Sequence, residues 1–151
     1  MLNRFTQFCS SISIIHRAIQ KIERDEMERY GNKGAYAQYL VAMNQYPDGV
    51  TASQLCELCD RDKAAVSRVL AEMEEKELIH REGSNYRAKL FLTDSGRRAA
   101  QFVCDRAVVA AMEAGKGLSE EDRAIFYAAL NLIASNLQTL SKGGLPEVKG
   151  D

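Results

Sequence analysis

Two helix-start signals lie close together in the middle of this chain. Thr51 and Gln54 have the types and the spacing of a capping box, in which the threonine hydroxyl accepts a backbone N–H and the glutamine side chain reaches back. Asp62 is a second N-cap candidate, and apolar residues recur at the helical period from there to about Glu77. Because only a short polar turn separates the predicted helix over 52–59 from the one after it, the sequence predicts a helix-turn-helix.

The segment that follows this pair predicts a β-hairpin. Two short segments, 78–81 and 86–92, are predicted strands and enclose a Gly-Ser-Asn tip. Val50, before the first helix of the pair, is predicted to form a short strand of its own. The sequence Thr-Asp-Ser-Gly at 93–96 then has the pattern of a helix cap. A hairpin directly after a helix-turn-helix is typical of a wing.

Amphipathic helices are predicted on both sides of this core. Residues 4–29 place apolar side chains at alternating spacings of three and four, which indicates a packing helix, and a shorter helix follows before the turn at 46–49. Glycines at 115 and 117 separate two further helices within 98–141, and Ser-Glu-Glu-Asp at 119–122 is an approximate capping box for the second of them. The apolar seams of the first and last helices contain Phe5, Phe8, Ile12, Ile15, Ile19 and Ile22, and Phe126, Leu130, Ile133, Leu137 and Leu140. The predicted fold class is mainly α, a winged helix-turn-helix with a two-stranded β wing.

Length and composition are those of one ordinary domain. A chain of 151 residues, 46% of them hydrophobic, can bury a core without a disulfide or a metal ion. We expect a single domain over 1–142, with the winged helix-turn-helix core at about 35–98, and a flexible tail over 143–151. With no signal peptide or apolar run of about 18 residues, we expect a cytoplasmic protein without a membrane partner.

No pattern in the sequence indicates catalysis, a metal site or a cofactor. Cys56 and Cys59 lack the second ligand pair of a zinc site and are expected to fill the core. The chain shows neither a Ser-His-Asp or Cys-His arrangement nor a phosphate-binding glycine loop. We therefore expect a protein that is not an enzyme.

Charge is distributed unevenly along the second helix of the pair. The net charge is only −1, so nucleic-acid binding must depend on local charge. Residues 61–70 hold Arg61, Lys63 and Arg68 against the single acid Asp62, and the second half of the helix is acidic. A recognition helix needs this arrangement, because its N-terminal residues meet bases and phosphates in the major groove. The alternative is an exposed helix whose charges are only solvated.

The predicted hairpin is also basic. Within 78–98, the cations Arg81, Arg87, Lys89, Arg97 and Arg98 outnumber the acids Glu82 and Asp94. A basic wing can follow the DNA backbone or place an arginine in the minor groove, but a solubilising hairpin would have the same composition. Thr51 and Ser53 present a similar choice, between holding a phosphate at a helix N-terminus and serving only as a cap.

These segments together resemble the MarR-type winged helix-turn-helix transcriptional regulators. The resemblance is carried by residues 51–59 (TASQLCELC), 62–81 (DKAAVSRVLAEMEEKELIHR) and 92–96 (LTDSG). It implies a homodimer whose N-terminal helix, 4–29, and C-terminal helices, 98–141, form the dimerisation region. It further implies that each winged helix reads one half of a pseudo-palindromic operator in double-stranded DNA.

The resemblance also assigns candidate DNA contacts. Lys63, Ala64, Ser67 and Arg68 match the positions at which the family contacts the major groove and phosphates. The wing departs from the family pattern, because residues 84–86 (SNY) replace the usual Asp-x-Arg and Arg87 follows one place late. Arg87 is our first choice for the minor groove. The candidate DNA-binding residues are Thr51, Ser53, Lys63, Ala64, Ser67, Arg68, Arg81, Asn85 and Arg87.

Two further sites follow from the resemblance. Family members often bind small aromatic or phenolic ligands, and His16, Arg17, Tyr36 and Tyr39 are the candidate pocket residues, with ordinary core positions as the alternative. In the peroxide-sensing branch a first-helix cysteine lies near tyrosines of the second helix, and Cys9 is similar to that cysteine, with an ordinary residue of the apolar seam as the alternative.

The sequence therefore predicts a sequence-specific DNA-binding transcriptional regulator, a homodimeric repressor that a small-molecule ligand releases from its operator. One alternative is a peroxide-responsive regulator that depends on the Cys9 thiol. An alternative of another class is a winged-helix module that contacts proteins and does not bind DNA.

Overall fold

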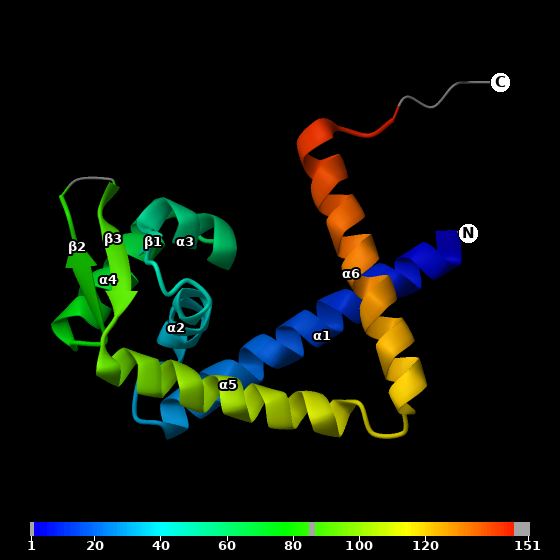
Figure 1. Ribbon diagram of the computed structural model, residues 1–151, viewed down its shortest axis with the longest axis horizontal. Helices are drawn as coiled ribbons and strands as arrows, with labels where there is room; N and C mark the ends of the chain where they lie inside the picture. Colours follow the sequence, from blue (N-terminus) through cyan, green and yellow to red (C-terminus); the bar gives the residue numbers. More distant parts are fainter. Residues whose placement is uncertain (1, 85–86, 147–151) are drawn as a thin grey trace. The chain divides into compact units, whose positions relative to one another are not determined.

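The computed structural model describes residues 2–84 and 87–146, and its elements follow the predicted order (Figure 1). Contacts divide the chain into two compact units, residues 1–110 and 111–151, which are described separately. The elements are α1 (Leu2–Arg29), η1 (Gly34–Tyr36), α2 (Ala37–Asn44), β1 (Val50–Thr51), α3 (Ala52–Cys59), α4 (Lys63–Glu75), β2 (Ile79–Glu82), β3 (Lys89–Leu92), α5 (Asp94–Ala114) and α6 (Glu120–Gly143). The expected fold class, mainly helical with a winged helix-turn-helix, is confirmed.

Local side-chain caps set the start of both helices of the helix-turn-helix. Thr51 and Gln54 form the predicted capping box, with the Gln54 N–H donating to Thr51 Oγ1 at 3.2 Å and the Thr51 N–H donating to Gln54 Oε1 at 2.8 Å. Asp62 Oδ1 accepts the Ala65 N–H at 2.9 Å at the start of α4. Each cap satisfies backbone donors that a helix N-terminus leaves unpaired, so the two predicted starts are confirmed.

The α4 helix ends at Glu75, slightly before the predicted end near Glu77. Glu77 has a left-handed backbone with φ +56°, and the Leu78 N–H turns back to the carbonyl of Met73 at 3.0 Å. This hydrogen bond closes the helix and directs the chain into β2. The early end therefore results from burial of Leu78 against the core, which the helical period did not show.

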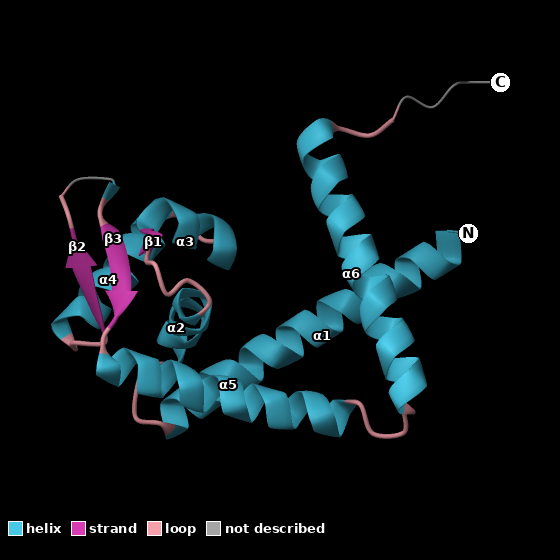
Figure 2. Cartoon of the chain, in the orientation of Figure 1, coloured by secondary structure: helices cyan, strands magenta, loops and turns pink. Residues whose placement is uncertain are grey.

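The wing belongs to a three-stranded antiparallel sheet with the order β1-β3-β2 (Figure 2). Strand β3 lies in the middle, where Leu90 faces Val50 of β1 on one side and Arg81 of β2 on the other. The predicted two-stranded hairpin is present, and β1 joins it as a third strand. Strand β2 has the predicted length but lies one residue later, and β3 is shorter than predicted because it begins at Lys89. Residues 85 and 86, of the predicted tip and second strand, lie outside the described residues.

The hydrophobic core joins α1, α2, the helix-turn-helix, the sheet and α5 within residues 1–110. The largest fully buried side chains are Tyr36, Tyr39, Met27, Leu40, Leu55, Leu70, Met73, Leu90, Val50, Val66 and Val103. Burial of side chains of this size stabilises a fold by about 1.5–3 kcal/mol each. The core thus fixes both ends of α4 against the sheet and α2.

The base of the hairpin is joined tightly to the start of α5. Thr93 Oγ1 donates to the Glu77 carbonyl at 2.6 Å and accepts the Gly96 N–H at 3.0 Å. The Thr93 N–H donates to the Leu78 carbonyl at 3.1 Å. A Cβ atom on Gly96 would lie 1.9 Å from that same carbonyl oxygen, so only glycine fits there. The Thr-Asp-Ser-Gly sequence therefore serves both as a helix cap and as a close contact between elements.

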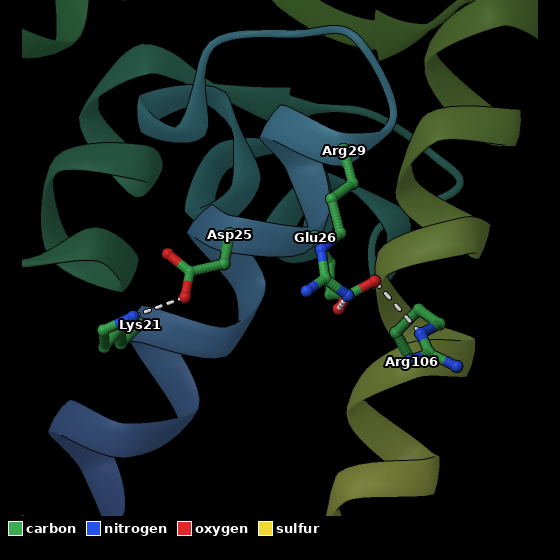
Figure 3. A network of polar contacts seen from close by, with 5 residues as sticks. All are labelled: Lys21, Asp25, Glu26, Arg29 and Arg106. Atoms are coloured by element: carbon green, nitrogen blue, oxygen red, sulfur yellow. Dashed lines mark hydrogen bonds and ion pairs between the residues drawn. The ribbon is translucent and has the colours of Figure 1, made fainter.

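An ion-pair network links α1 to α5 (Figure 3). Glu26 is buried, and its two carboxylate oxygens accept separate hydrogen bonds, from Arg29 Nη1 at 2.9 Å and from Arg106 Nε at 3.0 Å. Two charge-assisted bonds compensate for the burial of this carboxylate. The C-terminal part of α1 is thereby held beside α5.

In the second unit, α6 begins at the predicted Ser119 cap, where Ser119 Oγ accepts the Asp122 N–H at 3.1 Å. Arg123 Nη2 donates to the Gly115 carbonyl at 3.2 Å across the connecting turn. No described residue of α6 is buried within the chain. Within the described residues, the helices lack a segment of the length and apolar character that a membrane span requires.

Gly96→Ala should destabilise the protein by about 1–3 kcal/mol, because the new methyl group would overlap the Leu78 carbonyl. Chemical denaturation measures this free energy of unfolding. Gly143→Ala is the matched control, since a Cβ there meets no atom within 4 Å, and it should stay within about 0.5 kcal/mol of the wild type. Equal stability of the two variants would contradict the close contact.

Candidate nucleic-acid interface

The N-terminal half of α4 presents a narrow, exposed, basic face. Lys63, Ala64, Ser67 and Arg68 are all exposed, and their spacing places them on one side of the helix. The opposite side is buried, with Val66, Leu70 and Met73 in the core. The small side chains of Ala64 and Ser67 leave the helix backbone accessible between the two cations. The structure therefore brings these four predicted DNA-binding residues together.

The acid at the start of α4, Asp62, is hydrogen-bonded to the backbone of that helix. Hydrogen bonds from backbone N–H groups, first that of Ala65, lower the pKa of Asp62, and the charge of Arg68 contributes to the same direction. Asp62 is therefore ionised at neutral pH and strengthens the helix start. The exposed cations Lys63 and Arg68 remain the dominant charges of the face.

The predicted residues of α3 differ in their roles. The Thr51 side chain is bound in the capping box with Gln54, whereas the Ser53 side chain is exposed on the first turn. Thr51 thus has the structural role that the sequence left open, and Ser53 is oriented toward solvent.

The acidic half of α4 is bound by groups from other elements. Glu72 Oε2 accepts hydrogen bonds from Lys33 Nζ at 2.7 Å and from the Tyr36 hydroxyl at 3.0 Å. These bonds, first that of Lys33, lower the pKa of Glu72. Glu74 accepts two hydrogen bonds from Arg81 of the wing, each at 3.1 Å. The far end of the helix is therefore held against the loop after α1 and against β2.

The predicted wing residues have different environments. The Arg81 guanidinium is bound to Glu74, and Lys89 Nζ donates to the Asp48 carbonyl at 2.9 Å. Arg87 is exposed between the tip and β3. Asn85 lies outside the described residues. At the base of the wing Arg97 Nη1 donates to the Leu92 carbonyl at 2.8 Å.

A cavity of about 290 Å³ lies within the first unit, beside the start of α4. Its lining residues come from α1, from the η1–α2 segment and from the helix-turn-helix: Gln20, Glu23, Arg24, Gly34, Ala35, Ala37, Gln38, Tyr39, Arg61, Ala65 and Val69. The volume suits a small ring compound with a polar substituent. Because Ala65 and Val69 belong to α4, an occupant of the cavity would touch the candidate recognition helix directly.

The polar groups of the cavity carry both signs of charge. Partial burial raises the pKa of Glu23, and the charge of His16 acts in the opposite direction. Arg24 and Arg61 add two cations to the lining. The cavity can therefore pair with an acidic group of a ligand or, through Glu23, with a hydrogen-bond donor.

The structure places the four predicted pocket residues in different surroundings. Tyr39 lines the cavity, whereas Tyr36 is buried and binds Glu72 through its hydroxyl. His16 and Arg17 are exposed on α1, one to two turns before the lining residues of that helix. Sequence reasoning missed Gln20 and Glu23, although they continue the polar stripe of His16 at spacings of four and three.

The cysteines also differ in exposure. Cys9 is exposed on α1, 15 residues before Arg24, which corresponds to about 22 Å of helix. Cys56 and Cys59 pack against the core, as expected, and burial raises the pKa of Cys59 to about 11. The described residues contain no group of three or more His, Cys, Asp or Glu side chains placed to hold a metal ion.

Comparisons with known proteins agree with this geometry. A model of the MarR family matches residues 30–87, the segment from η1 to the wing. No curated protein of similar sequence was found.

Several solved structures have the same fold. A putative MarR family transcriptional regulator from Listeria monocytogenes, solved in complex with a 26mer DNA, has a TM-score of 0.72 and 22% sequence identity, over 93% of this chain and 97% of that one. A MarR transcriptional regulator from Methanosarcina mazei Go1 has a TM-score of 0.76 and 16% identity, over 88% and 90%. The MepR–DNA complex from Staphylococcus aureus has a TM-score of 0.66 and 21% identity, over 86% and 97%.

The resemblance to MarR-type winged helix-turn-helix regulators that the sequence predicts is thus confirmed, by the family model over residues 30–87 and by the fold over most of the chain.

Proposed function

We propose that this chain is a sequence-specific DNA-binding transcriptional regulator, and that it acts as a homodimeric repressor which a small molecule releases from its operator. The observation that carries the proposal is the exposed basic face of α4, on a winged helix in which Glu72 and Glu74 of the same helix are bound by Lys33, Tyr36 and Arg81. The likeness to two structures solved with DNA supports it.

The proposed DNA contacts are made by the first half of α4. Lys63 and Arg68 bind phosphates or base edges in the major groove, while Ala64 and Ser67 permit close approach. Ser53 adds a contact at the start of α3, and Arg87 follows the backbone or enters the minor groove beside it. The affinity is mostly electrostatic and therefore depends strongly on salt.

The proposed dimer follows from exposed apolar faces on two helices, each considered separately. On α1 the exposed large apolar residues are Phe5, Ile12, Ile14, Ile15 and Ile19. On α6 they are Ile125, Phe126, Tyr127, Leu132, Ile133 and Leu137. Apolar surface of this extent is unusual on a monomer, and a second copy of the chain covers it in our proposal. Two copies present two α4 helices to a pseudo-palindromic operator.

The proposed release uses the cavity beside α4. A small aromatic or phenolic compound that pairs with Arg61 or Arg24 would contact Ala65 and Val69 at the same time. Such a compound shifts the dimer only if it prefers one position of α4 over another. A shift that changes the distance between the two recognition helices from about 34–36 Å weakens operator binding.

Selection from a random duplex library tests the function as a whole. We expect an inverted repeat with half-sites about one helical turn apart, bound much more weakly at ~200 mM than at ~50 mM salt. A dimer in solution that selects no sequence would contradict DNA recognition and favour the protein-contact module.

Loss of operator binding after mild peroxide in the wild type, but not in Cys9→Ser, would favour the thiol-based alternative.

Arg68→Ala should weaken operator binding by about 1–3 kcal/mol, because the variant loses a cation at the major groove. A fluorescence-anisotropy titration of the selected operator measures the change. Lys76→Ala, at the C-terminal end of α4, is the matched control and should leave affinity within about 0.5 kcal/mol of the wild type. An Arg68→Ala protein with unchanged affinity would remove this residue from the interface.

Glu23→Gln should stabilise the protein at neutral pH. Burial raises the pKa of Glu23, so the folded state favours the protonated carboxyl over the ionised one. The stability that the protonated form contributes at low pH is therefore lost as the pH rises through that pKa. Denaturation at pH about 7.5 and about 4 should show an advantage for the variant only at the higher pH. The exposed Glu57→Gln is the control. A benefit of the same size at both pH values would contradict this role of burial.

A further inference from the structure

Arg81 occupies a strongly constrained position in the wing. Its Nε and Nη2 atoms donate to the two carboxylate oxygens of Glu74, each at 3.1 Å. This is the two-pronged geometry in which arginine recognises a carboxylate. A guanidinium held in this way has its fork directed at α4, and a lysine could not reproduce the arrangement.

The bond joins the recognition helix to an edge strand. Glu74 lies in the last turn of α4, and Arg81 lies in β2, which pairs with β3 on one side only. The other wing-strand cation, Lys89 of β3, is bound to the Asp48 carbonyl before β1. The hairpin is therefore tied at one edge to α4 and at the other to the loop that precedes the sheet.

We propose that Arg81 is a positioning residue, which sets the orientation of the wing on α4 through Glu74 and does not itself bind DNA. The inference rests on the proposed function, since it concerns how the two parts of one interface are aligned. Both side chains are about one-third exposed, so the pair adds little to the free energy of unfolding. The pair acts instead on DNA recognition. A small change in the angle of the wing separates the wing from the DNA, while α4 remains in the major groove.

The two possible roles of Arg81 predict opposite effects of removing Glu74. If Arg81 binds DNA, Glu74→Gln releases the arginine and removes a negative charge from the protein, so affinity for the operator rises. If Arg81 positions the wing, the same change leaves the guanidinium without its carboxylate and affinity falls.

The test compares Glu74→Gln, Arg81→Ala, Arg81→Lys and the double variant Glu74→Gln/Arg81→Ala on the selected operator and on a random duplex. We expect each variant to lose at least about threefold in operator affinity, with the double variant no weaker than Arg81→Ala alone. Affinity for the random duplex should fall less than affinity for the operator, so that the specificity ratio falls. Thermal melts should match that of the wild type.

The dependence on salt supplies an independent readout. The slope of log affinity against log salt should change by the same amount in Glu74→Gln and in Arg81→Ala, because both variants release the same wing, whereas a phosphate contact of Arg81 itself would be lost in Arg81→Ala only. Glu75→Gln is the matched control, as it removes the same charge from the same turn of α4, and it should not weaken binding.

Three outcomes would overturn the assignment. A slope reduced by about 0.9 in Arg81→Ala but unchanged in Glu74→Gln would identify a phosphate contact of Arg81. Tighter binding by Glu74→Gln, or full affinity of Arg81→Lys, would show that charge alone matters at this position. A wild-type dimer that selects no operator would overturn the proposed function itself, whereas normal wild-type binding with any of the first three results overturns the positioning role alone.

Discussion

The contact between Gly96 and the Leu78 carbonyl determines how the parts of the winged helix meet. Leu78 follows the end of α4 and precedes β2, and Gly96 lies in the first turn of α5. Thr93 connects the same two segments through hydrogen bonds to the Glu77 and Leu78 carbonyls. One junction thus fixes the end of α4, the base of the wing and the start of α5.

The folded arrangement separates the basic face of α4 from the acids of the same helix. A chain with a net charge of −1 has no general attraction for DNA, so a basic face must be separated from the acids around it. Here Glu72 and Glu74, in the second half of α4, are hydrogen-bonded to Lys33, Tyr36 and Arg81, and Asp62 accepts hydrogen bonds from the helix backbone. Lys63 and Arg68 are left as the exposed charges at the other end. The distribution depends on which side chains meet after folding.

Much of the fold was predictable because its signals are local. The caps at Thr51, Asp62 and Ser119 each use hydrogen bonds between residues three apart, and all three helices begin where these residues predict. Predictions that depended on distant contacts were less accurate. The α4 helix ends early because the Leu78 N–H bonds to Met73, and the wing gains a third strand because Val50 pairs with Leu90.

The sequence by itself determined the order of the elements, the helix starts and the polar, basic half of α4, since each of these follows from the spacing of neighbouring residues. Only the tertiary structure decided which cations stay available and where a cavity forms. Arg81 and Arg68 are both arginines. The Arg81 side chain, in β2, is paired with the Glu74 carboxylate of α4, and Arg68 takes no part in that pair. The cavity combines α1, the η1–α2 segment and α4, and such a space exists only when distant segments pack together.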